Sequence, residues 1–561
     1  MENRGIILCE RCQHHIDTQF HPIDPILLHS SHVPSQEQVT KTSDLLEQES
    51  QLLHQYESTI RHQRHTLERL EVAKSRLEAI ILKRRSTISI HRRVPVEVWR
   101  TIFLLACSKD GYFLTIDPPN RQARHRTALL QVCSRWRSIV IGCPEIWSAI
   151  NVNLLGERYI SMGDRMLVET FLANGAASPL TLHVTVRSAQ HWAKNSLATW
   201  ELLTRHFPRC EWLSLKLDDY TILSRYQGPH FTFHSLSSFY FDAALIPSSH
   251  PMDWDSPFWR ALRHAPKLTK VYLPEPRKLP RNSLPYLRLT TLVIGFTDVD
   301  DAAELLQVLE LSRSLRSFTL SQVQDLGSGN FDHIIRRVEM PSLQSLSFCV
   351  DGALPKMDNP ILTILFSSLT MPVLSTFKLA CARAFHNPTQ WYPPLLAMLQ
   401  RSSTALRHMS LFIHPVHCQK DAWEPLSILL ETTPHLSYLE FGGKWKANIL
   451  LFDGTPLPDS FISATVGDFI YTPQNAVLPN LKQISFVGIR LDPETLANVF
   501  ALASSRSPSR LSSTVDDVRA LTDLRVFYYA PQANPDLKPH TVEEIRRLGQ
   551  EGVKILLATD K

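Results

Sequence analysis

Glycine is scarce in this chain of 561 residues, which has 18 glycines against 37 prolines. Motifs that cradle phosphates or dinucleotides need closely spaced glycines, and neither the Walker loop nor Gly-x-Gly-x-x-Gly occurs. The hydrolase and zinc-protease motifs Gly-x-Ser-x-Gly and His-Glu-x-x-His are missing too. We therefore expect a protein that is not an enzyme and that needs no cofactor.

An excess of charge of one sign is also missing. The 59 Lys and Arg residues oppose 54 Asp and Glu residues, for a net charge of +5, which gives no support to nucleic-acid binding through overall charge. No run approaches the roughly 18 consecutive apolar residues that a transmembrane helix needs. We expect neither a nucleic-acid partner nor a membrane.

The nine cysteines are an odd number spread along the chain, and no Asn-x-Ser/Thr sequon occurs. Both observations favour an intracellular compartment, cytoplasmic or nuclear. Cys9 and Cys12, followed by His14, His15 and His21, could bind zinc, but a second well-spaced pair of cysteines is missing. We interpret residues 1–36 as a flexible arm and expect no metal site.

Residues 37–85 contain neither glycine nor proline and carry a 3.5-residue repeat. Its eleven seam positions are Leu46, Glu49, Leu53, Tyr56, Ile60, Gln63, Leu67, Leu70, Lys74, Leu77 and Ile81. Eight of them are apolar, and Glu49, Gln63 and Lys74 are polar. Such a repeat predicts one long amphipathic helix whose seam needs a partner. The partner is either a second copy, in a self-associating coiled coil, or another part of the same chain.

Residues 90–150 predict a small helical domain. Pro95 and Glu97 suit the start of a helix that continues with Ile102 and Phe103, and a second helix is expected over residues 128–140. Between them we expect a polar loop. Two short helices have little core of their own, so such a domain usually completes its burial on a partner.

This segment resembles the F-box family. The resemblance rests on Val94-Pro95-Val96-Glu97, on Ile102-Phe103 and on Val132-Cys133-Ser134-Arg135-Trp136-Arg137, and it covers about 50 residues. The first position is Val94 rather than the usual Leu, and the loop between the helices is longer than in the family pattern.

The resemblance implies that this segment docks on the Skp-type adaptor of a cullin–RING ubiquitin ligase. The adaptor-binding residues that it implies are Pro95, Glu97, Ile102, Phe103, Leu130, Val132, Cys133 and Trp136.

Residues 151–561 contain a recurring phrase of three apolar positions, in which two residues separate the first pair and one separates the second. Its eleven instances begin at Cys210, Leu236, Leu268, Leu289, Leu315, Leu343, Leu374, Leu406, Leu436, Leu481 and Leu524. Most are spaced near the repeat length of leucine-rich repeats, and helical patterns lie between them, for example at residues 300–309, 394–399 and 423–431. The expected fold class is therefore α/β: a long N-terminal helix, the F-box-like domain, and an irregular parallel β/α solenoid that resembles the leucine-rich-repeat class.

The residue between the last two apolar positions of each phrase points away from the core, because side chains alternate along a strand. These residues are expected to line one face that holds a protein substrate: Ser214, Tyr240, Tyr272, Val293, Thr319, Ser347, Lys378, Ser410, Glu440, Ser485 and Tyr528. Near the C-terminus, Thr541 and Glu544 predict a capping box that opens a closing helix.

The sequence thus predicts a substrate-recognition subunit of an SCF-type ubiquitin ligase that binds a Skp-type adaptor and an unknown protein substrate. The alternative is a scaffold or assembly protein without a ligase, which oligomerises through residues 37–85.

Overall fold

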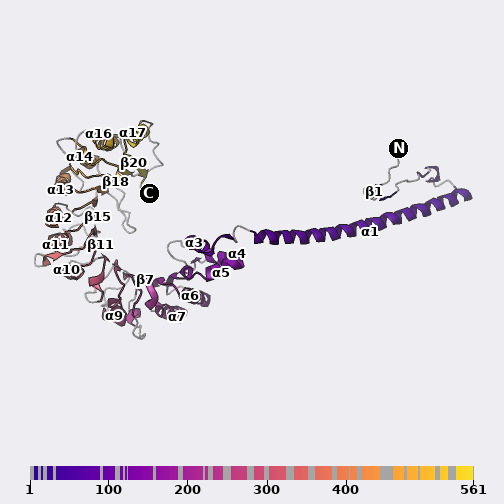
Figure 1. Ribbon diagram of the computed structural model, residues 1–561, viewed down its shortest axis with the longest axis horizontal. Coiled ribbons are helices and arrows are strands. Elements are labelled where there is room, and N and C mark those ends of the chain that lie inside the picture. Colours follow the sequence, from indigo (N-terminus) through magenta and orange to yellow (C-terminus); the bar gives the residue numbers. More distant parts are fainter. Residues whose placement is uncertain are drawn as a thin grey trace. The chain divides into compact units, whose positions relative to one another are not determined.

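A computed structural model represents the chain (Figure 1). It describes residues 6–9, 14–16, 22–23, 25–28, 33–88, 93–107, 114–117, 120–122, 124–155, 160–187, 194–218, 221–224, 232–243, 254–274, 283–295, 302–323, 334–350, 360–381, 388–402, 405–413, 420–442, 459–472, 477–489, 493–511, 518–528 and 539–559. The chain forms two compact units, Met1–Trp99 and Arg100–Lys561. The expected boundary at residue 150 does not coincide with this division.

The first unit is dominated by the 52-residue helix α1 (Gln36–Thr87), which confirms the predicted long N-terminal helix. A capping box starts it: Ser35 Oγ accepts the Gln38 N–H at 3.3 Å, and Gln38 Oε1 accepts the Ser35 N–H at 2.8 Å. Preceding it are the antiparallel strands β1 (Ile6–Cys9) and β2 (His14–Ile16) and the short helix η1 (Pro25–Leu28).

The backbones of Cys9 and His14 pair in this hairpin, whereas Cys12 and His21 lie outside the described residues. The described part of the chain contains no group of three or more His, Cys, Asp or Glu side chains that could hold a metal ion. In that part of the chain, no helix combines the length and apolarity that crossing a membrane requires.

The predicted helical domain contains α3 (Val96–Cys107), α4 (Arg124–Val132) and α5 (Ser134–Ile141). The prediction of a single helix over residues 128–140 is wrong, because the helix is interrupted at Cys133. Its thiol sulfur accepts the Trp136 N–H at 3.4 Å and so caps α5. Arg137 Nε donates to the Leu130 carbonyl at 2.9 Å, which fixes the angle between the two helices.

The segment expected to be only a loop also contributes strands. These are β3 (Leu114–Asp117) and β4 (Asn120–Gln122), which pair antiparallel. Strand β3 pairs parallel with β5 (Ala149–Leu155), and Leu114 and Ile116 are buried. Strands β3 and β4 therefore extend the large sheet at this end, and they belong to the same compact unit, Arg100–Lys561.

The second unit is built on an open 16-stranded sheet in which all pairs except β3–β4 are parallel. Its strands follow the chain order: β6 (Leu180–Arg187), β7 (Cys210–Leu217), β8 (Ser238–Asp242), β9 (Lys270–Leu273), β10 (Thr291–Gly295), β11 (Ser317–Val323), β13 (Ser345–Val350), β15 (Thr376–Cys381), β16 (His408–Ile413), β17 (Tyr438–Gly442), β18 (Gln483–Ile489), β19 (Asp523–Tyr528) and β20 (Lys554–Thr559). The short strands β12 (Val338–Glu339) and β14 (Leu369–Thr370) pair separately. This confirms an α/β fold with a large parallel sheet.

Helices connect the strands and follow one another along one side of the sheet (Figure 1). They are α6 (Met162–Asn174), α7 (Lys194–Thr204), α8 (Thr221–Ser224), α9 (Pro257–Arg263), α10 (Ala302–Leu311), α11 (Pro360–Ser368), α12 (Pro388–Ser402), α13 (Lys420–Glu431), α14 (Asp459–Phe469), α15 (Pro493–Ser505), α16 (Pro508–Leu511) and α17 (Pro539–Gln550). Single 3-10 turns are η2 (Pro144–Trp147), η4 (Phe207–Arg209) and η5 (Tyr286–Arg288).

The core lies between the helices and one face of the sheet. It contains the apolar residues of the first ten instances of the recurring phrase, which are buried. Hydrogen bonds at the starts of the strands link the repeated units. For example, the Ser375 carbonyl accepts the N–H groups of Arg407 at 2.9 Å and His408 at 3.0 Å. The Ser437 hydroxyl donates to the Arg407 carbonyl at 3.0 Å, which adds a side-chain bond to the same row.

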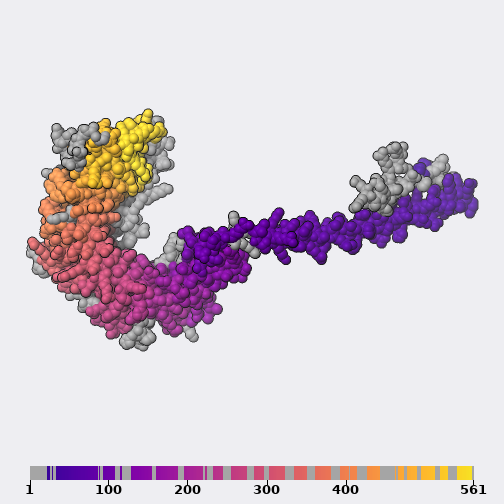
Figure 2. Space-filling model, in the orientation of Figure 1, coloured from indigo at the N-terminus to yellow at the C-terminus, as the bar shows by residue number. Residues whose placement is uncertain are grey.

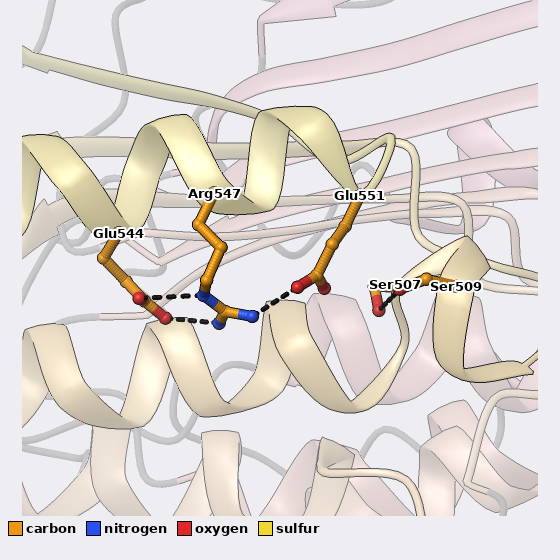
Figure 3. Close-up of polar contacts among 5 residues, drawn as sticks. All are labelled: Ser507, Ser509, Glu544, Arg547 and Glu551. Atoms are coloured by element: carbon orange, nitrogen blue, oxygen red, sulfur yellow. Dashed lines mark hydrogen bonds and ion pairs between the residues drawn. The ribbon is translucent and has the colours of Figure 1, made fainter.

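The chain closes with α17 and β20. Helix α17 begins at Pro539, so the predicted capping box at Thr541 is wrong, and Thr541 is buried inside the helix. Glu544 instead holds Arg547, whose guanidinium also donates to Glu551 (Figure 3). The hydrogen bond from Arg547 lowers the pKa of Glu544. These i, i+3 and i, i+4 pairs run along the polar side of α17.

Candidate protein-binding surfaces

The helices α3, α4 and α5 have a small aromatic core. The rings of Phe103 and Trp136 meet edge to face, with centroids 4.9 Å apart. Arg100 donates to the Gly142 carbonyl at 3.0 Å and joins α3 to the end of α5. Trp147 Nε1 donates to the Val140 carbonyl at 2.8 Å, which anchors the chain where it enters β5.

Apolar side chains remain exposed on all three helices. Ile102 is 43% exposed, Leu105 74%, Val132 57% and Ile141 50%. We call these four residues the exposed apolar set. A small domain that leaves this much aliphatic surface in water offers a contact to another protein.

The residues that the F-box resemblance implies fall into three classes. Pro95, Glu97, Ile102, Val132 and Cys133 are exposed, whereas Leu130 and Trp136 are half-buried. Phe103 is 1% exposed, so an adaptor contact through its side chain is wrong for this structure. Helical spacing explains the difference: Phe103 lies on the side of α3 that also buries Cys107, and Ile102 lies on the other side.

Leu105 and Ile141, like Val96 and Val98 in α3, are exposed apolar residues that the sequence reasoning missed as contacts. Leu105 follows Ile102 on one helical face, a spacing that could have indicated it. Ile141 ends a helix whose start was misplaced, so its face could not be deduced from the sequence.

The strand residues on the sheet face opposite the helices form a continuous row, in which Ser214, Ser410 and Ser485 are buried. The register aligns His183, Ser214, Tyr240, Tyr272, Val293, Thr319, Ser347, Lys378, Ser410, Glu440, Ser485 and Arg525. We call this the sheet-face row. Tyr528 was misplaced: it pairs with Ile489, and Arg525 takes the position beside Ser485.

A polar cluster lies at the N-terminal part of this row. His183 Nδ1 is 2.6 Å from Ser214 Oγ, and its Nε2 is 3.3 Å from Thr185 Oγ1. Lys216 forms an ion pair with Asp242 at 2.9 Å. Burial, together with the positive charge of Lys216, lowers the pKa of His183, while Asp242 opposes this change.

The lowered pKa of His183 makes the stability of the second unit depend on pH. The unfolded chain protonates this histidine near pH 6.5, whereas the folded chain resists protonation, so stability falls as the pH drops from about 6.5 through the folded pKa. His183→Gln is expected to show a smaller loss of stability between pH 7 and pH 5 than wild type, measured by urea unfolding. His264 is exposed, so His264→Gln serves as the matched control. If the free energy of unfolding fell equally between pH 7 and pH 5 in both variants, His183 would not be the source of the pH dependence.

A second polar cluster lies at the C-terminal part of the row. Ser410 donates to Glu440 Oε2 at 2.9 Å, and Arg525 forms an ion pair with Asp523 at 2.8 Å. Burial and the negative charge of Glu440 raise the pKa of Tyr438 to about 12. The centroids of the His408 and Tyr438 rings are 5.8 Å apart. Both charge signs and aromatic rings are therefore available along this face.

An apolar row runs beside this polar cluster and was missed by the sequence reasoning. Cys349, Ala380, Phe412 and Val487 form a buried cluster against which Phe527 packs. They lie two residues beyond the sheet-face row, so they share its face. Gly442 completes this row because a Cβ there would approach the Phe412 ring to 2.5 Å.

Comparison with known proteins adds no relative. Neither a protein-family model nor a curated protein matches the chain.

Proposed function

We propose that this chain is a non-enzymatic substrate-recognition subunit of an SCF-type cullin–RING ubiquitin ligase. Its helices α3–α5 bind a Skp-type adaptor, and its sheet binds the protein to be ubiquitylated. The observation that carries the proposal is the exposed apolar set on the segment that resembles an F-box. The structure thus leaves a surface for the adaptor contact that the resemblance implies.

The adaptor contact is assigned to Ile102, Leu105 and Val132, with Pro95 directly before α3 and Glu97 in its first turn. Burying aliphatic side chains of this size contributes about 1.5–3 kcal/mol each when they become fully covered. The internal Phe103–Trp136 pair holds the helices that present them. Phe103 therefore acts through the fold of the domain.

The substrate surface is assigned to a leucine-rich-repeat-like solenoid. Consecutive strands pair in parallel and in chain order, and buried leucines recur at equivalent positions. Both features support stacked repeats, in which each unit covers its neighbour. The sheet-face row combines Tyr240, Tyr272, Lys378 and Glu440, and this mixture of aromatic and polar side chains suits a protein partner.

In this role the chain does no chemistry itself. Holding adaptor and substrate together raises the effective concentration of substrate lysines at the ligase, whose catalytic groups lie in other chains. A scaffold without ligase activity is the second candidate, because the apolar seam of α1 is exposed and offers a route to assembly. Adaptor binding distinguishes the two.

The test is co-purification of a Skp-type adaptor with the full chain. Leu105→Glu and Ile102→Glu are expected to reduce adaptor recovery at least about tenfold, because each places a charge in a contact that must lose water. Leu287→Glu is the matched control, since Leu287 is equally apolar and 67% exposed but lies in η5. Absence of adaptor from the wild-type preparation, or equal recovery with all variants, would remove the ligase assignment.

A further inference from the structure

Helix α1 presents an uncovered apolar seam. The aliphatic seam residues are between 41% and 65% exposed: Leu46, Leu53, Ile60, Leu67, Leu70, Leu77 and Ile81. Helices in water gain most of their stability from packing an apolar face. A 52-residue helix with this seam therefore calls for a partner of matching length and pattern.

The charged residues within the seam discriminate between arrangements of two copies. In a parallel pair in register, each seam residue meets itself. Glu49 would then face Glu49, and Lys74 would face Lys74, at positions removed from water. Like charges at such positions oppose association.

A complete antiparallel overlap removes both conflicts. When Gln36 of one copy lies opposite Thr87 of the other, Glu49 lies opposite the second copy's Lys74, and the two-fold symmetry creates this pair twice. The same register sets Leu46 opposite Leu77 and Leu53 opposite Leu70. The layers Leu46–Leu77, Leu53–Leu70 and Tyr56–Leu67 are thus apolar, and the charged residues meet their opposites, whereas Ile60 meets Gln63 and Ile81 meets Thr42.

The flanking residues fit this register too. Next to the seam, it brings Leu45 toward Ile80 of the second copy and Leu52 toward Ala73, which widens the apolar contact. Within one chain, Lys74 has only a 4.0 Å ion pair with Glu78, and both side chains are more than half exposed. Such a surface pair contributes little, so it does not compete strongly with Glu49 of the second copy.

We propose that α1 binds a second copy of this chain as a full-length antiparallel coiled coil, with its register set by two Glu49–Lys74 pairs. At 1.5 Å per residue, the helix is about 78 Å long. The two Thr87 residues then lie at opposite ends of the coil. The proposal does not depend on adaptor binding.

Sedimentation of full-length variants tests this arrangement. Wild type is expected to dimerise, and Glu49→Lys to weaken dimerisation at least about tenfold, because it creates two Lys–Lys contacts. Adding Lys74→Glu to that variant restores opposite charges and is expected to restore the dimer. Glu47→Lys makes the same charge change on an exposed position outside the seam and is the matched control.

A parallel coil predicts a different result, because neither the single nor the double exchange alters its number of like-charge contacts. Dimerisation that is unchanged by Glu49→Lys would overturn the antiparallel register. A wild-type chain that stays monomeric at about 100 µM would overturn self-association itself, while leaving adaptor binding untouched. Helicity measured by circular dichroism verifies that each variant keeps α1.

Discussion

Replacing Arg506 with Met is expected to destabilise the C-terminal part of the sheet unit by about 3 kcal/mol or more. The Arg506 side chain is completely buried. Its guanidinium donates to the carbonyls of Phe469 at 2.9 Å, Leu478 at 3.0 Å and Val477. Methionine would fill much of the space but would remove a donor from all three carbonyls. The Leu478 carbonyl keeps the Leu481 N–H at 3.1 Å, and a buried carbonyl that is left without a donor costs about 1–3 kcal/mol.

Removing a buried charge also gives back some desolvation energy, which offsets part of this loss. Burial is strong enough here to lower the pKa of Arg506 to about 10. The bonds to the three carbonyls should still dominate, because they join the end of α14 to the turn in which Leu478 adopts a φ of 54°. A non-glycine residue in this conformation persists only where neighbouring contacts hold it.

The loss should be local, so hydrogen exchange of amides in α14 and β18 measures it better than a single global melt. Arg546→Met is the matched control, because Arg546 is exposed on α17. Protection in α14 that is equal in both variants would show that other contacts hold the turn.

Arginine in this role recurs and could not be recognised in the sequence. Arg209 donates to the carbonyls of Leu172 and Gly175, and Arg401 to those of Phe366 and Leu369. Each therefore donates to carbonyls at the end of an earlier helix, where the next helical N–H groups are missing. Each of these hydrogen bonds joins an arginine to a carbonyl 32 to 37 residues earlier in the sequence. The sequence itself shows only an arginine between two apolar segments, so the pairing could not be read from it.

What the sequence could predict follows from periodicity. The 3.5-residue repeat located α1 to within two residues at each end, and the apolar phrase located the strands. The phrase failed at the last instance because two frames fit there. Leu521, Leu524 and Val526 are the buried set, although Leu524, Phe527 and Tyr529 match the same pattern. The shift moved the predicted surface residue from Arg525 to Tyr528.

The candidate adaptor surface was predictable only in part. The F-box resemblance pointed to Ile102 and Val132, but the break at Cys133 depends on a thiol cap that no helical pattern signals. Strand β3 was equally hidden, because a four-residue strand is defined by its pairing with its neighbours β4 and β5. Local patterns thus predict elements, whereas the faces they expose depend on contacts distant in sequence.

The adjacent residues Ile102 and Phe103 should lose very different amounts of stability on truncation. Phe103→Ala is expected to cost about 3–5 kcal/mol of local stability, because it empties a buried site against the Trp136 ring. Ile102→Ala removes a side chain that is 43% exposed and should cost less than about 1 kcal/mol. Urea unfolding, together with hydrogen exchange in α3 and α5, measures both changes.

The same pair separates a structural effect from a contact effect in adaptor binding. Ile102→Ala should weaken the adaptor while α3–α5 remain folded, since the residue acts at the surface. Phe103→Ala should weaken it only to the extent that these helices unfold, so lowering the temperature should restore binding in this variant and not in Ile102→Ala. If Phe103→Ala kept full protection in α3 and still lost the adaptor, Phe103 would have to leave its buried position to make the contact, and the division of roles between the two residues would be wrong.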